Sequence, residues 1–170
     1  MRFAVALMLL PVLPFAPLTA PAFAQAAPQA GAQDQALLDF LDQAFDERLG
    51  LSPESQTQLG LKTNYAKLDD YTDAASVRDQ ELAERQLKAM HARFKPDQLG
   101  ESARVSYRLF EYEVERGRES LRFRKLRFPV STNGSPAGAI PVLLINNHKI
   151  DSVADAEAYI ARLRDTDRVM

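Results

Sequence analysis

The chain has few of the residues on which common catalytic sites depend. Its 170 residues include no cysteine and only two histidines, His91 and His148. The absence of cysteine excludes disulfides, thiol nucleophiles and thiolate zinc sites. No second histidine, cysteine or glutamate stands at metal-ligand spacing from His148, and no Ser/His/Asp pattern stands out. The residues alone therefore predict no catalytic, cofactor-binding or metal-binding residue.

An excess of positive charge is also missing. The formal net charge is −2, so no overall field would recruit nucleic acid or an anionic membrane. Hydrophobic residues make up 46% and charged residues 26% of the chain, which is ordinary for a globular protein. The length is sufficient for one domain with a real core.

The first residues have the order of a cleavable signal peptide. Arg2 precedes an apolar stretch over residues 3–18, and small residues follow it up to Ala24. Prolines interrupt that stretch, which is already shorter than the about 20 residues of a transmembrane helix. We therefore expect cleavage between Ala24 and Gln25, and a mature protein that is periplasmic or secreted and has no membrane anchor.

We expect three segments along the chain. Residues 1–24 are the signal peptide, residues 25–33 a flexible leader rich in Ala, Pro and Gln, and residues 34–170 a helical region. Apolar periodicity predicts five or so amphipathic helices in this region. Their expected ranges are 34–49, 53 to about 60, 73 to about 94, 100 to about 117, and a last one from about 153.

Local signals support the helix boundaries. Ser52 is a good N-cap, Thr72 or Asp73 would cap the next helix, Pro53 suits a first helical position, and the residue before Pro96 is pushed out of helical geometry. Ser152, with Asp155 three residues later, is a further N-cap signal. In the last helix one stripe collects the apolar residues Val153, Ala156, Ile160 and Leu163.

Residues 121–138 are predicted to be extended or loop. LRFRKLRFPVS alternates apolar and basic residues, and STNGSPAG is rich in turn formers. The apolar run AIPVLLI, residues 139–145, fits either a buried strand or a buried piece of helix. The overall prediction is a mainly helical, all-α fold.

The stretch RFRKLRF interleaves basic and aromatic residues, a pattern that also occurs in proteins that bind single-stranded nucleic acid. The acidic total and the export signal oppose that reading. We expect a half-buried extended segment with a solvated basic edge, and no nucleic-acid partner.

Five stretches, taken in order, resemble one bacterial family. They are FDERLGLSPESQTQLGL, YAKLDDYTDA, ARVSYRLFEYEVE, FPVSTNGSPAGAIPVLLINNHKI and SVADAEAYIARL. Together they resemble the N-terminal part of the domain-of-unknown-function 885 (DUF885) family over nearly all of residues 35–170. Such proteins are largely helical, often exported, and several times longer than this chain.

The family in turn resembles gluzincin-type zinc metallopeptidases. Its motif, H-E-x-x-P-G-H-H, lies downstream of the matched region, where two histidines would bind Zn²⁺ and the glutamate would activate water. No residue of this chain matches that motif, so the resemblance implies zinc only for full-length relatives. It also implies that the loop 131–138 contributes to a substrate groove, with Asn133, Gly134, Ser135 and His148 as the candidate residues.

Two main hypotheses follow. The first is an N-terminal helical scaffold that is inactive alone, whose partner is the missing C-terminal catalytic part and whose substrate is a peptide. It predicts exposed apolar faces, and the helix-start signal Thr166-Asp167 favours it. The second is a complete, non-enzymatic periplasmic helical binding module, with every amphipathic face covered. A weaker third is an enzyme built on His148 and nearby carboxylates, although a turn residue that bonds local backbone is the favoured interpretation of His148.

Overall fold

The computed structural model describes residues 31–126, 128, 130 and 134–169. Within these residues the chain forms six α-helices and two short 3₁₀ helices, and it forms no strand there, so the predicted all-α class is confirmed. The α-helices are α1 (Ala32–Leu49), α2 (Pro53–Gln58), α3 (Asp73–Arg93), α4 (Glu101–Arg122), α5 (Pro136–Asn146) and α6 (Val153–Val169). The 3₁₀ helices are η1 (Pro96–Gln98) and η2 (Arg124–Leu126). None of the described helices is long and apolar enough to cross a membrane.

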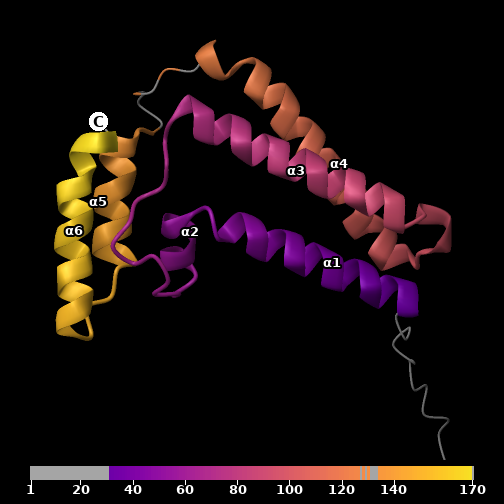
Figure 1. Cartoon of the computed structure of the whole chain (residues 1–170), viewed down its shortest axis with the longest axis horizontal. Coiled ribbons are helices and arrows are strands. Elements are labelled where there is room, and N and C mark those ends of the chain that lie inside the picture. The colour runs from indigo at the N-terminus through magenta and orange to yellow at the C-terminus, as the bar shows by residue number, and fades with distance from the viewer. Residues whose placement is uncertain (1–30, 127, 129, 131–133, 170) are drawn as a thin grey trace, which may run out of the picture.

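The main core lies between the three long helices α1, α3 and α4, which run along one another (Figure 1). At its centre the ring of Phe40 packs edge-on against Phe94, 5.8 Å away, and against Phe110, 6.5 Å away. The buried members of this core are Leu37, Phe40, Ala44, Ala83, Leu87, Met90, Phe94, Leu99, Ala103, Tyr107, Phe110 and Val114.

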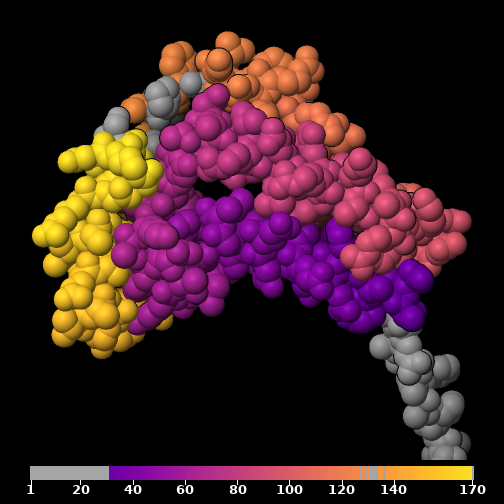
Figure 2. Space-filling view, viewed as in Figure 1, coloured from indigo at the N-terminus to yellow at the C-terminus, as the bar shows by residue number. Residues whose placement is uncertain are grey.

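A second, smaller core lies at the other end of the molecule. The hairpin of α5 and α6 packs against α2 and the connection that follows it, away from the free end of α1 (Figures 1 and 2). Its buried residues are Leu68, Ile140, Leu143 and Leu144, with Tyr159 and Val169 partly buried against them. The α5–α6 hairpin therefore has few apolar contacts for its length.

The predicted N-caps Ser52 and Ser152 are confirmed, and of the two candidates Thr72 and Asp73 it is Thr72 that caps α3. The hydroxyl of Ser52 accepts from the backbone N–H of Ser55 over 3.2 Å, and the hydroxyl of Thr72 accepts from Ala75 over 3.1 Å. The hydroxyl of Ser152 accepts from the N–H of Asp155 over 3.2 Å. These bonds satisfy donors that the first turn of a helix leaves free, which explains why local sequence located the helix starts.

Helix α4 runs on to Arg122 instead of ending near Gly117. Gly117 faces α3, where a Cβ atom at this position would lie 2.5 Å from Oε1 of Gln80. The amide of Gln80 also donates to the carbonyl of Val114 over 3.1 Å. The glycine therefore permits the Gln80 side chain to lie against α4, and it does not end the helix.

The prediction of a half-buried extended segment after residue 120 is wrong where the structure describes it. Helix α4 includes Leu121 and Arg122, and residues 124–126 form η2. Phe123, Leu126 and Phe128 are exposed, so alternation of apolar and basic residues did not mark a buried face. Arg124 stabilises the turn instead, because it donates to the carbonyl of Leu121 over 3.0 Å and pairs with Asp73.

The run AIPVLLI is helical and forms most of α5. Ser135 caps this helix by accepting from the N–H of Gly138 over 3.3 Å, and Pro136 occupies the first helical position. Pro141 lies inside the helix, while Ile140 and Leu143 are buried on one side of it.

Thr166 and Asp167 do not begin a new helix. Both lie inside α6, and the hydroxyl of Thr166 donates to the carbonyl of Arg162 over 3.1 Å. Threonine followed by aspartate fits an N-cap by residue type alone. A threonine within a helix can instead bond the carbonyl one turn earlier.

The apolar stripe of α6 faces away from the small core. Val153 is 77%, Ile160 46% and Leu163 51% exposed. The buried positions of the same helix are polar, and they are Asp155 and Arg162. Sequence periodicity identified the stripe, but the structure shows that this stripe does not cover the core.

Candidate functional site

Two of the residues predicted for a substrate groove, Ser135 and His148, lie at opposite ends of α5. Ser135 lies just before α5 and His148 lies just beyond its end, and the 11-residue helix between them spans about 16 Å. Gly134 precedes the Ser135 cap. Asn133, like the predicted cleavage site at Ala24 and Gln25, lies outside the described residues.

His148 is buried, and its ring nitrogens are both in use. Nε2 lies 3.0 Å from the carbonyl oxygen of Asp155, and Nδ1 lies 3.2 Å from Nη1 of Arg162. The ring stacks on Tyr65 at 4.0 Å and meets the edge of Tyr159 at 5.2 Å. The ring of His148 bonds the backbone carbonyl of Asp155, seven residues along the chain, and belongs to a buried polar cluster.

Arg162 is the centre of this cluster and is fully buried. Its Nε donates to the carbonyl of Lys67 over 2.8 Å, and its Nη2 donates to the hydroxyl of Thr57 over 2.7 Å and the carbonyl of Pro53 over 3.2 Å. Burial lowers the pKa of Arg162 from its ordinary value, yet a guanidinium stays protonated in proteins. The side chain thus joins α6 to α2 and to the connection between α2 and α3.

Two carboxylates extend the cluster toward the surface. Asp155 accepts from Lys62 over 2.8 Å and from the N–H of Asp151 over 3.0 Å, and these bonds lower the pKa of Asp155 to about 2. Glu54 accepts from the hydroxyl of Tyr71 over 2.9 Å. Burial, and then the neighbouring Glu54 carboxylate, raise the pKa of Tyr71. We call Glu54, Thr57, His148, Asp155 and Arg162 the polar cluster.

The polar cluster holds parts of the fold together. Arg162 and His148 direct their donors and acceptors at other protein groups. Neither nitrogen of the His148 ring is free to hold a ligand. The described part of the chain contains no group of three or more His, Asp and Glu side chains that could hold a metal ion. His91 lies elsewhere, on the surface, where it pairs with Glu111 over 2.7 Å.

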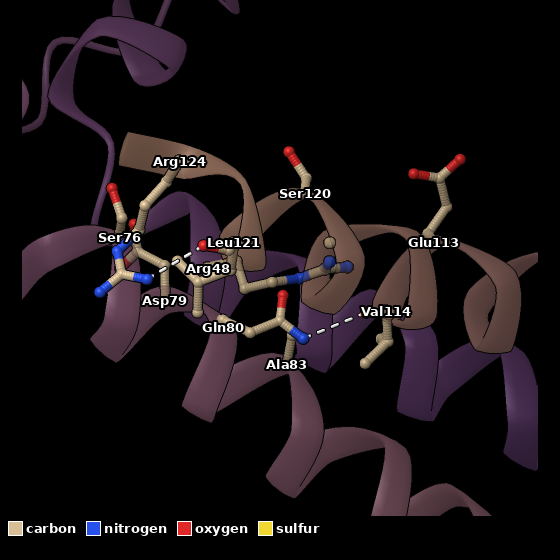
Figure 3. A pocket seen from close by; sticks show the side chains of 11 residues that line it. Arg48, Ser76, Asp79, Gln80, Ala83, Glu113, Val114, Ser120, Leu121 and Arg124 are labelled. Atoms are coloured by element: carbon tan, nitrogen blue, oxygen red, sulfur yellow. Dashed lines mark hydrogen bonds between the residues drawn. The ribbon is translucent and has the colours of Figure 1, made fainter. Parts of the chain in front are cut away.

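A cavity of about 370 Å³ lies where α1, α3 and α4 meet, and we call it the Arg48 cavity (Figure 3). Arg48 extends into it from the end of α1, and its guanidinium lies 5.3 Å from the centre of the Phe110 ring. Gln80 and Ser120 lie beside the Arg48 side chain in this view. The other lining residues are Ser76, Asp79, Ala83, Glu113, Val114, Gly117, Leu121 and Arg124.

Arg48 and Asp79 also line a neighbouring cavity of about 330 Å³ on the α2 side. A hollow between α1 and α3 is visible on the surface in Figure 2. Sequence reasoning missed this region, because its walls come from three helices that only the tertiary fold brings together. A single arginine in the last turn of a helix is an ordinary feature that gives no local signal.

Comparison with known proteins supplies a family for the chain. No curated protein and no solved structure matches it. A family model described as "Bacterial protein of unknown function (DUF885)" matches residues 53–170, which leaves α1 before the matched region. Because the match spans α2 to α6 and most of the chain, this protein belongs to the DUF885 family.

Proposed function

We propose that this chain is the helical scaffold of an exported, zinc-metallopeptidase-like protein and that it is inactive by itself. The outward-facing apolar stripe of α6 is the observation that carries the proposal. A scaffold needs a face that another part of the protein covers. On this proposal the covering part is the downstream catalytic region, which would hold the zinc motif of the family and act on a peptide.

The stripe is large enough to matter energetically. Burying an Ile, Leu or Val side chain contributes about 1.5–3 kcal/mol, and α6 leaves Val153, Ile160 and Leu163 exposed. On the adjacent helix α5, Val142 and Ile145 are also exposed. Exposed apolar side chains gathered on neighbouring helices are typical of surfaces that bind another protein surface.

The geometry of His148 supports the proposal that the chain is inactive by itself. Both of its nitrogens are engaged by Arg162 and by the backbone of Asp155, so neither is free to activate water or to bind a metal ion. A catalytic role would require the ring to leave its stack on Tyr65 and to break both bonds.

An activity assay on the purified mature chain tests this proposal. A mixture of fluorogenic peptides should show no hydrolysis with added zinc. Turnover that a chelator abolishes and zinc restores would overturn the claim that the chain is inactive alone.

The native size of the protein separates the scaffold from a second candidate, a complete periplasmic binding module. The outward stripe of α6 would then contact a separate protein. An antibody against residues 101–118, used on a periplasmic extract, should detect a species several times heavier than this chain if the scaffold proposal holds. A species of the mature length would favour the binding module.

A further inference from the structure

We propose that a second copy of this chain docks on the outer side of α4, with the two α4 helices antiparallel across a twofold axis. The inner side of α4 lies along α3 and α1, and its buried residues are Ala103, Tyr107, Phe110 and Val114 (Figure 1). The outer side is the one opposite these residues. The contact does not involve the α5–α6 hairpin, so it stands apart from the proposed function.

The outer side of α4 carries a second apolar stripe. Val105, Leu109 and Tyr112 follow one another by one helical turn each, and each side chain is more than half exposed. At 3.6 residues per turn this spacing keeps the three side chains in one line, opposite the buried residues. Arg116 continues the line, and its long side chain can lie along apolar surface while its guanidinium reaches water. We call Val105, Leu109 and Tyr112 the α4 stripe.

Charged residues on one side of the α4 stripe reverse sign about the middle of the helix. That middle lies between Glu111 and Tyr112. At 3.6 residues per turn, residues of opposite charge stand on this side at equal distances from the middle. The three pairs are Arg108 with Glu115, Arg104 with Glu119, and Glu101 with Arg122. When two antiparallel helices pack about a twofold axis, the same side of each meets in reversed order, so each of these residues would face an opposite charge on the copy.

Within one chain the same charges are unfavourable. Arg104 and Arg108 are like charges one helical turn apart, a spacing at which repulsion destabilises a helix. The same holds for Glu115 and Glu119. The side chains of Arg108 and Glu115 form no hydrogen bond or ion pair with another described residue. They lie about 10 Å apart along the axis of α4, too far to pair within one chain, so a copy would supply the opposite charge that each lacks.

Arg108 and Glu115 are the central contacts of the proposed pair, and the outer residues add to them. Arg104 already donates to two carbonyls of the α3–α4 connection, and Glu119 pairs with Arg122 over 2.8 Å. Exposed ion pairs contribute little to affinity. The α4 stripe therefore supplies most of the attraction, and the charges select the antiparallel orientation.

The other side of the α4 stripe is nearly uncharged. The serines Ser102, Ser106 and Ser120 lie there, and Glu113 is the one charged residue of α4 on that side. Glu113 would lie close to its own copy beside the twofold axis, so Glu113→Gln should leave the dimer as tight or tighten it. A dimer that Glu113→Gln weakens would contradict the proposed register.

Analytical ultracentrifugation of a purified chain that begins at residue 25 tests the proposal. We expect a monomer–dimer equilibrium at concentrations up to about 1 mM, and Leu109→Ser should weaken the dimer by about tenfold or more. Leu163→Ser is the matched control, since Leu163 is about as exposed on the α6 stripe, and it should leave the dimer unchanged. A chain that stays monomeric would overturn the proposal. So would a dimer that Leu163→Ser weakens and Leu109→Ser does not.

Two charge reversals test the pairing itself. Arg108→Glu alone, or Glu115→Arg alone, would place like charges opposite each other at both central contacts, and each should weaken the dimer by about tenfold at low ionic strength. An equimolar mixture of the two variants should associate about as tightly as the unchanged chain, because every central contact of the mixed pair then joins opposite charges. Circular dichroism verifies that both variants fold. A mixture that associates no better than either variant alone would overturn the proposal.

Single cysteines test the antiparallel register, because the chain contains no cysteine of its own. Tyr112→Cys lies next to the twofold axis and should form a disulfide between copies under mild oxidation. Val105→Cys lies on the same stripe but about 20 Å along the helix from its copy, so it should not. Cross-linking of both variants would indicate a parallel pair and overturn the proposed arrangement.

Discussion

Nη1 of Arg162 donates a hydrogen bond to Nδ1 of His148 over 3.2 Å, and both side chains are buried. An arginine can only donate, so Nδ1 must accept and the ring proton must be on Nε2. Nε2 then donates to the carbonyl of Asp155 over 3.0 Å. The pair therefore fixes one tautomer of His148 and ties the end of α5 to α6.

Replacing Arg162 should destabilise the protein strongly. In an Arg162→Met variant the hydroxyl of Thr57, the carbonyl of Pro53 and Nδ1 of His148 each lose a donor in a buried position. Buried polar groups left without a partner cost about 1–3 kcal/mol each, although the losses are not additive. We expect the free energy of unfolding to fall by about 3 kcal/mol, measured by urea denaturation with circular dichroism.

Arg164→Met is the matched control, since Arg164 is exposed on the same helix and has no described partner. It should change the free energy of unfolding by less than about 0.5 kcal/mol. If the two variants were equally stable, the hydrogen bonds of Arg162 would not be what holds α6 in place.

The free energy of unfolding should fall in acid, partly because the Asp155 carboxylate becomes protonated. Hydrogen bonds, above all the one from Lys62, lower the pKa of Asp155 from its ordinary 3.8 to about 2 in the folded protein. Between these two values the unfolded chain binds a proton that the folded chain does not, so acid favours unfolding. The contribution of Asp155 is complete above about pH 4 and is lost as the pH falls toward about 2.

An Asp155→Asn variant isolates this effect. Chemical denaturation at a series of pH values should show wild type more stable than the variant near neutral pH. The difference should shrink below about pH 4. A difference that stays constant down to pH about 2 would mean that the Lys62 bond does not lower the pKa of Asp155.

Local sequence signals predicted the helix starts well. They failed where tertiary contacts decide the secondary structure. Ser52, Thr72 and Ser152 cap helices because each hydroxyl bonds a backbone N–H three residues away, an arrangement written in the sequence itself. Whether AIPVLLI is strand or helix depends on its neighbours, and hydrophobic periodicity could not decide between them. The Thr166-Asp167 motif predicted a helix start wrongly, because its residue types fit an N-cap but it lies inside α6.

The polar cluster and the Arg48 cavity could not be predicted from spacing. Arg162 bonds Thr57 and Pro53 from more than half the length of the chain away, so no local pattern links them. Periodicity identified an apolar stripe on α6 and a polar side opposite it. Periodicity does not say which of these two sides of α6 faces the core. Because arginine is rarely buried, sequence alone favours the apolar side, whereas the polar side with Arg162 is the buried one.

Two isoleucines on the α5–α6 hairpin test the orientation of α6. Ile140 is 1% exposed, whereas Ile160 is 46% exposed. Ile140→Ala should lower the free energy of unfolding by about 3 kcal/mol, because it removes buried atoms and leaves a cavity. Ile160→Ala should lower it by less than about 1 kcal/mol, measured by the same denaturation experiment. A larger loss for Ile160→Ala would mean that the stripe of α6 faces the core.

Helix α1 should be required for folding although it precedes the region that the family model matches. It supplies Leu37, Phe40 and Ala44 to the main core, where Phe40 contacts both α4 and the end of α3. A chain that begins at residue 53 would leave the apolar faces of α3 and α4 open to water. We expect such a chain to bind an apolar dye and to lose its cooperative thermal transition.

A chain that begins at residue 31 is the control, because it keeps all of α1. It should melt cooperatively and bind little more dye than a chain that begins at residue 25. A point substitution gives an independent measure, since Phe40→Ala should cost about 3–5 kcal/mol. If the chain from residue 53 melted cooperatively without dye binding, α3 and α4 would be stable without α1, and the core described by Phe40, Phe94 and Phe110 would not be essential to the fold.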